Sequence, residues 1–350
     1  MNNIDTYIEY YKDKTFTECL FNDIDNLIFS MLAYLPIENE AFKTEKKLSE
    51  VEKLLSKTDV KKLSKTPASA INILKQISTS KRFEEATISN PVSILNNETQ
   101  FSAITIRFGV FDCYVSFKGT DTSIIGWKEN FDLSYKYPTP AVKFAIDYLQ
   151  NTIKFIDKNI YVGGHSKGGN LAMASSMSQP SEIFNKIKHV YNNDGPGFLD
   201  KEFESEKYKR MAKKLTVFVP EESVVGILLN NSNVSVIKSS AFSISQHYPT
   251  TWQCFGQFLI KGKLSASSEK IRQELNEWIN DTTTENREML INTFFDVLKE
   301  SKITDFKQLS KLKPSEINEM FNKTKNIDDH TKNILLSTIK MFFKKPTSNK

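Results

Sequence analysis

The chain has 350 residues, of which 39% are hydrophobic and 25% charged, proportions that are ordinary for a globular protein and exclude extended disorder. The formal net charge of +5 arises within residues 311–350, which hold nine Lys and four acidic residues, so the remaining chain is balanced. We therefore expect no nucleic-acid partner. The basic C-terminal region is expected to form a solvated Lys-rich face or to contact an anionic membrane surface peripherally.

No apolar run approaches the roughly 18 residues of a membrane-spanning helix, and the N-terminal residues lack the basic start and apolar stretch of a signal peptide. The cysteines, Cys19, Cys113 and Cys254, lie far apart and are typical of free thiols, which favours a cytoplasmic protein. The four histidines lack the spacing of a metal site. We expect neither a metal ion nor a cofactor.

The first predicted element is an amphipathic helix over residues 17–35, because apolar residues from Leu20 to Leu35 recur at helical spacing. Residues 43–77 are rich in Lys, Glu and Ser and carry one apolar stripe, which predicts a helical insertion at about residues 38–88. Because this insertion precedes the core strands, we interpret it as a candidate lid.

The core is predicted to begin near residue 101. Two β-rich runs, residues 101–108 and 111–118, are joined at Gly109 and predict a sequential pair of strands. Helical and strand-like patterns then alternate, which predicts an α/β fold with a mainly parallel sheet that helices cover on both faces. The predicted strands are residues 159–164, 188–193, 215–220 and 233–239, and the predicted helices are residues 139–156, 167–177 and 201–215.

Beyond residue 262 the pattern becomes wholly helical. Four amphipathic segments follow one another up to Phe343. We therefore divide the chain into a core domain, residues 1–262, and a helical C-terminal region, residues 263–350.

A candidate nucleophile lies between a predicted strand and a predicted helix. Gly164-His165-Ser166-Lys167-Gly168 matches the G-x-S-x-G motif, in which a serine sits on a sharp turn and needs small residues on both sides. At the start of the helix, the backbone N–H of Lys167 is a candidate donor to an oxyanion. The alternative is a plain strand-to-helix turn that happens to contain a serine.

A serine nucleophile needs a histidine as base and a carboxylate that orients the histidine. If the chain order is serine, acid, histidine, the base is His247 or His330, whereas His189 comes too early. We favour His247, which lies in a loop after the strand-like residues 233–239. The alternative is a loop histidine with a structural role.

The favoured acid is Asp194, which follows the strand over residues 188–193, because α/β sheets place functional groups at the carboxyl ends of strands. Glu221 and Glu222, at the end of the next strand, are its rivals. An Asx turn is the structural alternative for Asp194.

The second oxyanion donor is expected in the loop after residues 111–118. There the chain turns at Gly119-Thr120-Asp121, so the N–H of Thr120, together with its hydroxyl, is the candidate. A turn without catalytic role is the alternative.

The segments FKGTDTSIIGWKENFDLSY, GGHSKGGNLA, YNNDGPGF, VPEESVVGILL and SQHYPTTW, in that order, resemble the Mbeg1-like family of bacterial proteins, and the first two are also similar to fungal-type (class 3) lipases. The resemblance covers about residues 17–260. It implies an α/β-hydrolase fold with Ser166 as nucleophile, Thr120 and Lys167 at the oxyanion hole, and His247 as base. Class 3 lipases carry their acid in a D-x-V-P motif, but the corresponding residues here are Ser223-Val224-Val225-Gly226, so the carboxylate must come from elsewhere.

Together these features predict a serine hydrolase that cleaves carboxylic esters, either acyl lipids or small esters, through an acyl-enzyme. Its partner is then a small-molecule or lipid ester substrate. Peptide or acyl transfer by the same residues is a weaker possibility. The alternative from another class is a non-catalytic binding or scaffolding protein with the same fold, which the absent D-x-V-P acid and the extra C-terminal helices favour.

Overall fold

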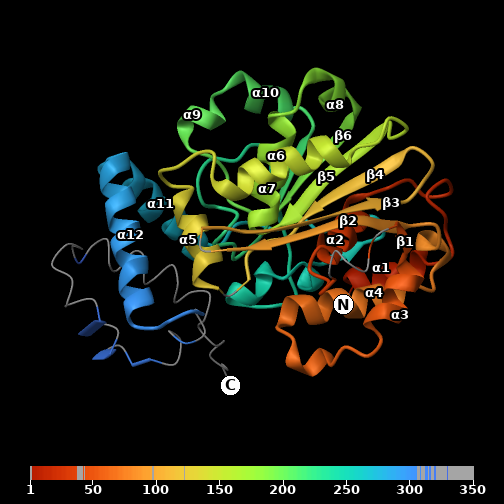
Figure 1. Cartoon of the computed structure of the whole chain (residues 1–350), viewed down its shortest axis with the longest axis horizontal. Coiled ribbons are helices and arrows are strands. Elements are labelled where there is room, and N and C mark those ends of the chain that lie inside the picture. The colour runs from red at the N-terminus through yellow and green to blue at the C-terminus, as the bar shows by residue number, and fades with distance from the viewer. Residues whose placement is uncertain are drawn as a thin grey trace.

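The computed structural model describes residues 2–37, 42, 44–96, 98–121 and 123–305, together with residues 308, 312–313, 315–316, 319–320 and 329. Its centre is an eight-stranded sheet in which spatial order follows chain order from β1 to β8 (Figure 1). The strands are β1 (Lys46–Lys47), β2 (Thr87–Leu95), β3 (Gln100–Arg107), β4 (Asp112–Phe117), β5 (Asn159–His165), β6 (Ile187–Asn193), β7 (Leu215–Pro220) and β8 (Val234–Ile237).

Strands β1 to β4 pair antiparallel, and β4 to β8 pair parallel. The predicted α/β fold with a mainly parallel sheet is therefore confirmed. A separate two-stranded sheet joins β9 (Cys254–Phe255) to β10 (Phe258–Leu259).

The α-helices of the described residues are α1 (Ile4–Tyr11), α2 (Asp23–Leu32), α3 (Leu48–Leu55), α4 (Lys65–Ile77), α5 (Ile124–Asp132), α6 (Pro140–Thr152), α7 (Lys167–Met177), α8 (Ser181–Lys186), α9 (Asp200–Phe203), α10 (Glu206–Ala212), α11 (Ala266–Asp281) and α12 (Thr284–Glu300). Short 3₁₀ helices lie at Val60–Lys62, Lys81–Phe83, Ser243–His247 and Pro249–Thr251.

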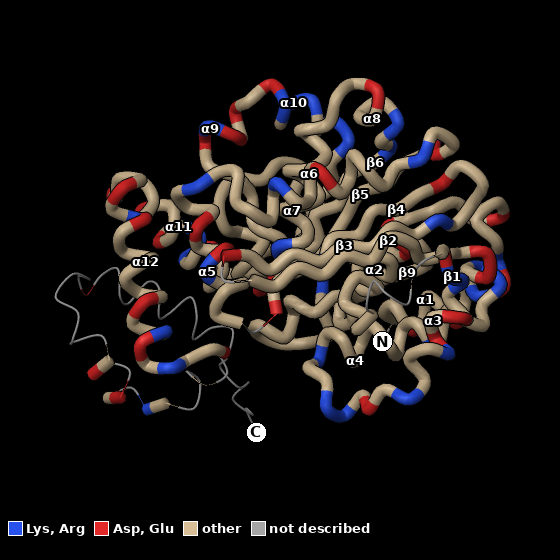
Figure 2. The backbone as a smooth tube through the Cα atoms, viewed as in Figure 1, with Lys and Arg blue, Asp and Glu red and all other residues tan. Residues whose placement is uncertain are grey.

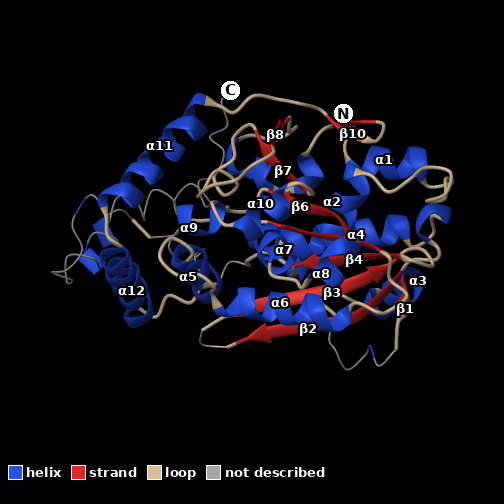
Figure 3. Cartoon of the chain, turned by 90° about the horizontal axis from the view of Figure 1, so that it is seen from above, coloured by secondary structure: helices blue, strands red, loops and turns tan. Residues whose placement is uncertain are grey.

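Helices cover both faces of the sheet (Figures 1 and 3). On one face α1, α2 and α4 pack over a core that includes Ile104 and Tyr114, and on the other α6, α7 and α10 pack over a core that includes Val115 and Val162. Tyr114 and Val115 are neighbours on β4 and belong to opposite cores, because successive side chains of a strand point to opposite faces.

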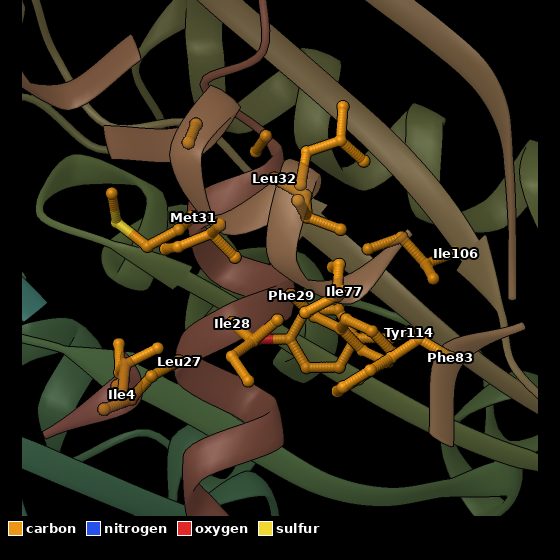
Figure 4. Close-up of a cluster of buried hydrophobic side chains, with 14 of the residues drawn as sticks. Ile4, Leu27, Ile28, Phe29, Met31, Leu32, Ile77, Phe83, Ile106 and Tyr114 are labelled. Carbon is orange, nitrogen blue, oxygen red and sulfur yellow. The ribbon is translucent and has the colours of Figure 1, made fainter. Parts of the chain in front are cut away.

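Helix α2 lies at the centre of the first core. Asn22 begins the helix through a capping box with Asp25, and every residue from Ile24 to Leu32 is buried. Figure 4 shows the α2 side chains in one cluster with residues of α4, β3 and β4, among them Leu27, Ile28, Phe29, Ile77, Ile106 and Tyr114.

Three sequence predictions differ from the structure. Leu20 is 76% exposed and lies outside helix α2, because the cap at Asn22 starts the helix later than predicted. Strand β2 was not predicted. The helix predicted over residues 201–215 is two helices, α9 and α10, because the Ser205 side chain accepts the N–H of Tyr208 and caps a new helix.

The described part of residues 38–88 contains α3 and α4, and β1 pairs with the start of β2 at the edge of the sheet.

Helix α12 of the C-terminal region packs beside α5 (Figures 1 and 3), where the rings of Phe295 and Phe131 lie 5.8 Å apart. The two later helical segments expected up to Phe343 fall almost wholly outside the described residues, as does His330. No helix in the described ranges is long and apolar enough to cross a membrane.

A buried ion pair fastens α2 to the segment before β2. The Asp25 and Arg82 side chains are both inaccessible to solvent, and Arg82 Nε lies 2.9 Å from Asp25 Oδ1. Asp25→Ala leaves the guanidinium buried without its counter-ion, so we expect urea unfolding to give a free energy of unfolding lower by about 3–5 kcal/mol.

Glu206→Ala is the control for this prediction, because it breaks an exposed ion pair with Lys209. We expect it to change stability no more than an ordinary surface substitution. Equal losses in the two variants would contradict the structural role of the buried pair.

Candidate active site

Ser166 lies on a strained turn between β5 and α7. Its backbone has φ 59° and ψ −134°, a region that residues other than glycine rarely adopt, and its N–H donates to the Asn193 carbonyl at 2.9 Å. A Cβ on Gly164 would lie 2.4 Å from the carbonyl carbon of Gly168, so the turn needs small residues at these positions. Strained backbone of this kind is frequent at functional sites.

Asp194 and His247 are in direct contact. Asp194 follows β6, its side chain is fully buried, and its Oδ2 lies 2.6 Å from His247 Nδ1. The other carboxylate oxygen accepts hydrogen bonds from the Ser223 hydroxyl and from the Gly226 N–H, the latter at 3.1 Å. The segment Ser223–Gly226, which lacks an acid of its own, therefore holds the carboxylate of Asp194 in place.

His247 ends a short 3₁₀ helix, and its side chain is 14% exposed. Because Nδ1 faces Asp194, Nε2 is the ring nitrogen that lies away from the carboxylate. His247, Ser166 and Thr120 line one cavity of about 300 Å³. Three of the five predicted site residues therefore line one cavity, and a fourth, Asp194, contacts His247.

The loop after β4 lies directly against Ser166. A Cβ on Gly119 would lie 2.8 Å from the Ser166 Cβ, and the Gly119 N–H donates to the Tyr34 hydroxyl at 3.0 Å. The Thr120 hydroxyl donates to Asn130 Oδ1 at 3.2 Å. Within the described part of the chain, the Thr120 N–H donates to no other group, which leaves it available to a ligand.

Lys167, the fifth predicted residue, has separate backbone and side-chain roles. As the first residue of α7, its N–H has no acceptor within the helix. Its side chain is buried and points away from solvent, with Nζ 2.8 Å from Glu129 Oε2 and 2.7 Å from the Gln100 carbonyl. Glu129 also accepts from the Thr99 hydroxyl at 2.9 Å and from the Ala141 N–H at 2.8 Å.

Sequence reasoning missed this contribution of α5. Its residues Glu129 and Asn130 bind the side chains of Lys167 and Thr120, the two candidate oxyanion donors. A signal was present, because both residues lie in the GWKENF segment that carries the family resemblance. The segment alone does not reveal its partners, because Glu129 and Lys167 are 38 positions apart.

His165 is a second residue that was missed. Its Nε2 lies 2.7 Å from the carbonyl oxygen of His247, which can only accept, so Nε2 carries the proton. Nδ1 then accepts from the Tyr34 hydroxyl at 2.9 Å. Burial, and to a lesser extent the nearby His247, lower the pKa of His165 well below its ordinary value, so the ring stays neutral. This neutral ring connects the His247 loop to Tyr34 and Gly119.

The rival residues lie elsewhere. His189, on β6, bonds to the Thr216 hydroxyl at 2.8 Å and does not line the cavity. Among the described residues, neither the Glu221 nor the Glu222 carboxylate bonds to His247. Glu222 instead donates its backbone N–H to the side-chain oxygen of Gln246 at 2.9 Å.

A family model described as Mbeg1-like matches residues 77–296, so the match begins later than residue 17 and extends past residue 260, into α12. The fold class expected from the sequence, an α/β-hydrolase fold, is confirmed by the sheet and by the order of β5, the Ser166 turn and α7. A helical segment lies before the core strands, and another, formed by α11 and α12, follows them.

Two solved structures are similar to the chain. One is M37 lipase, with 16% identity and a TM-score of 0.35 over 63% of this chain and 70% of that chain. The other is a fungal lipase in complex with an inhibitor, with 15% identity and a TM-score of 0.36 over 69% of this chain and 88% of that chain. Similarity at this level carries no information on activity. The comparison with curated proteins gives no match.

His165, which is buried, and His189, which is half-buried, predict a pH dependence of stability. Burial lowers the pKa of His189 to about 4, and the pKa of His165 is also lowered. Since an unfolded histidine has a pKa of about 6.5, the unfolded state binds more protons below that pH, and the free energy of unfolding falls. We expect a loss of up to about 1.4 kcal/mol per pH unit from each histidine.

Urea unfolding at neutral pH and near pH 5 tests this dependence. The variant His189→Gln removes one of the two groups while keeping a partner for Thr216, so its loss of stability on acidification should be smaller than that of the parent. The same loss in both proteins would refute the contribution of His189.

Proposed function

The chain belongs to the Mbeg1-like family, whose model matches more than half of its residues, and on this premise we propose that it is a serine hydrolase that cleaves carboxylic esters. The observation that carries the proposal is the Asp194–His247 contact of 2.6 Å beside a cavity that both His247 and Ser166 line. A nucleophile and a base oriented by a carboxylate are what acyl transfer requires.

In the proposed reaction, the Ser166 hydroxyl attacks the ester carbonyl while His247 takes its proton. The N–H groups of Thr120 and Lys167 stabilise the oxyanion that forms. The bond between the acyl carbon and the alcohol oxygen then breaks, and the alcohol leaves with the proton from His247. Water, deprotonated by His247, attacks the acyl-serine, which releases the acid and restores the Ser166 hydroxyl.

The insertion before the core strands is proposed as part of the site. Ser64, Lys65, Thr66 and Pro67, at the start of α4, line the cavity together with Ser166. A lid role for this segment is consistent with that position. The cavity volume of about 300 Å³ favours small esters over long acyl chains.

The alternative of a non-catalytic binding protein drew on the absence of the D-x-V-P acid. The contact between Asp194 and His247 supports the enzyme instead, because it supplies a carboxylate at the required ring nitrogen.

A cytoplasmic location is also proposed, and the three cysteines, all free thiols, are consistent with it. Peripheral membrane contact of the basic C-terminal region remains a proposal from charge alone.

Labelling with a fluorophosphonate probe tests the proposed nucleophile. We expect the native protein to become covalently labelled and Ser166→Ala to remain unlabelled, because the probe reacts with activated serines. A folded native protein that does not react would argue against an enzyme. Equal labelling of Ser166→Ala would reject this serine.

A second pair of variants tests the acid. Asp194→Asn removes the charge behind His247 while keeping the size of the side chain, so we expect kcat for ester hydrolysis to fall by about 10³–10⁴. Glu222→Gln is the matched control, since this rival carboxylate makes no bond to His247, and it should keep the parental rate. A larger loss in Glu222→Gln than in Asp194→Asn would reverse the assignment.

A further inference from the structure

Two lysines line the cavity that contains Ser166. Lys118 directly follows β4 and precedes the oxyanion loop, and Lys65 is the first residue of helix α4. Among the described residues that line this cavity, Asp121 is the one carboxylate. Its Oδ1 accepts the N–H of Ser123 at 2.8 Å.

Neither lysine forms an ion pair with a carboxylate in the described part of the chain. The Lys65 ammonium lies 3.8 Å from the centre of the Tyr248 ring, a cation–π contact, and Lys118 forms no ion pair. Lys167, by contrast, pairs with Glu129. Figure 2 shows that charged residues are concentrated on the outer helices and loops, while most of the central sheet is uncharged.

Lys118 is half-buried, whereas Lys65 is exposed. Burial lowers the pKa of both lysines. For Lys118, the nearby charge of Asp121 opposes this shift, and the charge of Lys167 adds a smaller lowering. A cation that has lost water without forming an ion pair is destabilised, and a bound anion would restore the lost interaction. Perturbed groups that line a cleft are frequent in ligand-binding sites.

The rest of the lining is mixed in polarity. Ser64, Thr66, Thr120 and Asn130 contribute hydroxyl and amide groups. Apolar surface comes from the rings of Tyr34, Trp127 and Tyr248 and from Pro67 and Val225. Such a wall suits a short substrate that has both a polar group and an apolar part.

We infer that the substrate is a small ester that carries an anionic group, a carboxylate or a phosphate, which Lys118 and Lys65 bind while Ser166 attacks the ester carbonyl. This inference rests on the proposed hydrolase function and names its substrate class. The lysines act on binding and orientation of the ester, and the chemical steps at Ser166 are unchanged.

A matched pair of substrates tests the inference. Mono-para-nitrophenyl adipate carries a free carboxylate, and its methyl ester has nearly the same size without the charge. We expect kcat/KM to be at least about tenfold higher for the anionic substrate, or ~1.4 kcal/mol, and this preference to shrink as salt screens the charges.

Variants assign the preference to the two lysines. Lys118→Gln and Lys65→Gln should each lower the ratio of the two kcat/KM values severalfold, and Lys118→Glu should bring it below one. Lys143→Gln, on the exposed surface of α6, is the control and should keep the parental ratio. Competition by free adipate or by inorganic phosphate then distinguishes which anion the lysines accept.

The outcomes separate this inference from the proposed function. If both esters are hydrolysed equally well and Lys118→Gln leaves the ratio unchanged, the anionic substrate class is wrong while the hydrolase stands. If neither ester is hydrolysed and the fluorophosphonate does not react, the proposed function fails, and the inference fails with it. Because the readout is a ratio measured on one protein sample, a partial loss of folded variant does not alter it.

Discussion

The buried ion pair between Lys167 and Glu129 is the interaction on which the site depends. Lys167 follows the nucleophile directly, and its ammonium is anchored to α5 and to the Gln100 carbonyl on β3. Glu129 in turn accepts hydrogen bonds from the segment before β3 and from the start of α6. Two buried charges are costly unless both are fully bonded, as they are here, so the pair specifies one position of α5 relative to the Ser166 turn.

Helix α5 also contacts the second candidate oxyanion residue, Thr120, and the helices of the C-terminal region. Asn130, next to Glu129, holds the hydroxyl of Thr120, so one helix positions both candidate oxyanion residues. The opposite side of α5 packs on α12, where Ile124 and Phe131 contact the core of the C-terminal helices. The family match reaches residue 296, within α12, which is consistent with these helices being part of the same structural unit.

Local signals pointed to the residues that are proposed to act in the reaction, but they left Glu221 and Glu222 as rival acids. The G-x-S-x-G turn predicts Ser166, and the carboxyl end of a strand predicts Asp194, because each depends on a few neighbouring residues. The supporting contacts were not predictable in the same way. Tyr34 meets His165 across 131 positions, and only folding brings them together. The start of α2, the division into α9 and α10, and strand β2 were missed because caps and tertiary pairing override the apolar pattern.

The central claim is that Ser166 is a nucleophile whose oxyanion is bound by the Thr120 and Lys167 amides. A crystal structure of the protein after reaction with an alkyl fluorophosphonate tests it most directly. We expect phosphorus bonded to Ser166 Oγ and the phosphonyl oxygen about 2.7–3.1 Å from both backbone nitrogens. An adduct on another residue, or a phosphonyl oxygen that faces away from both amides, would contradict it.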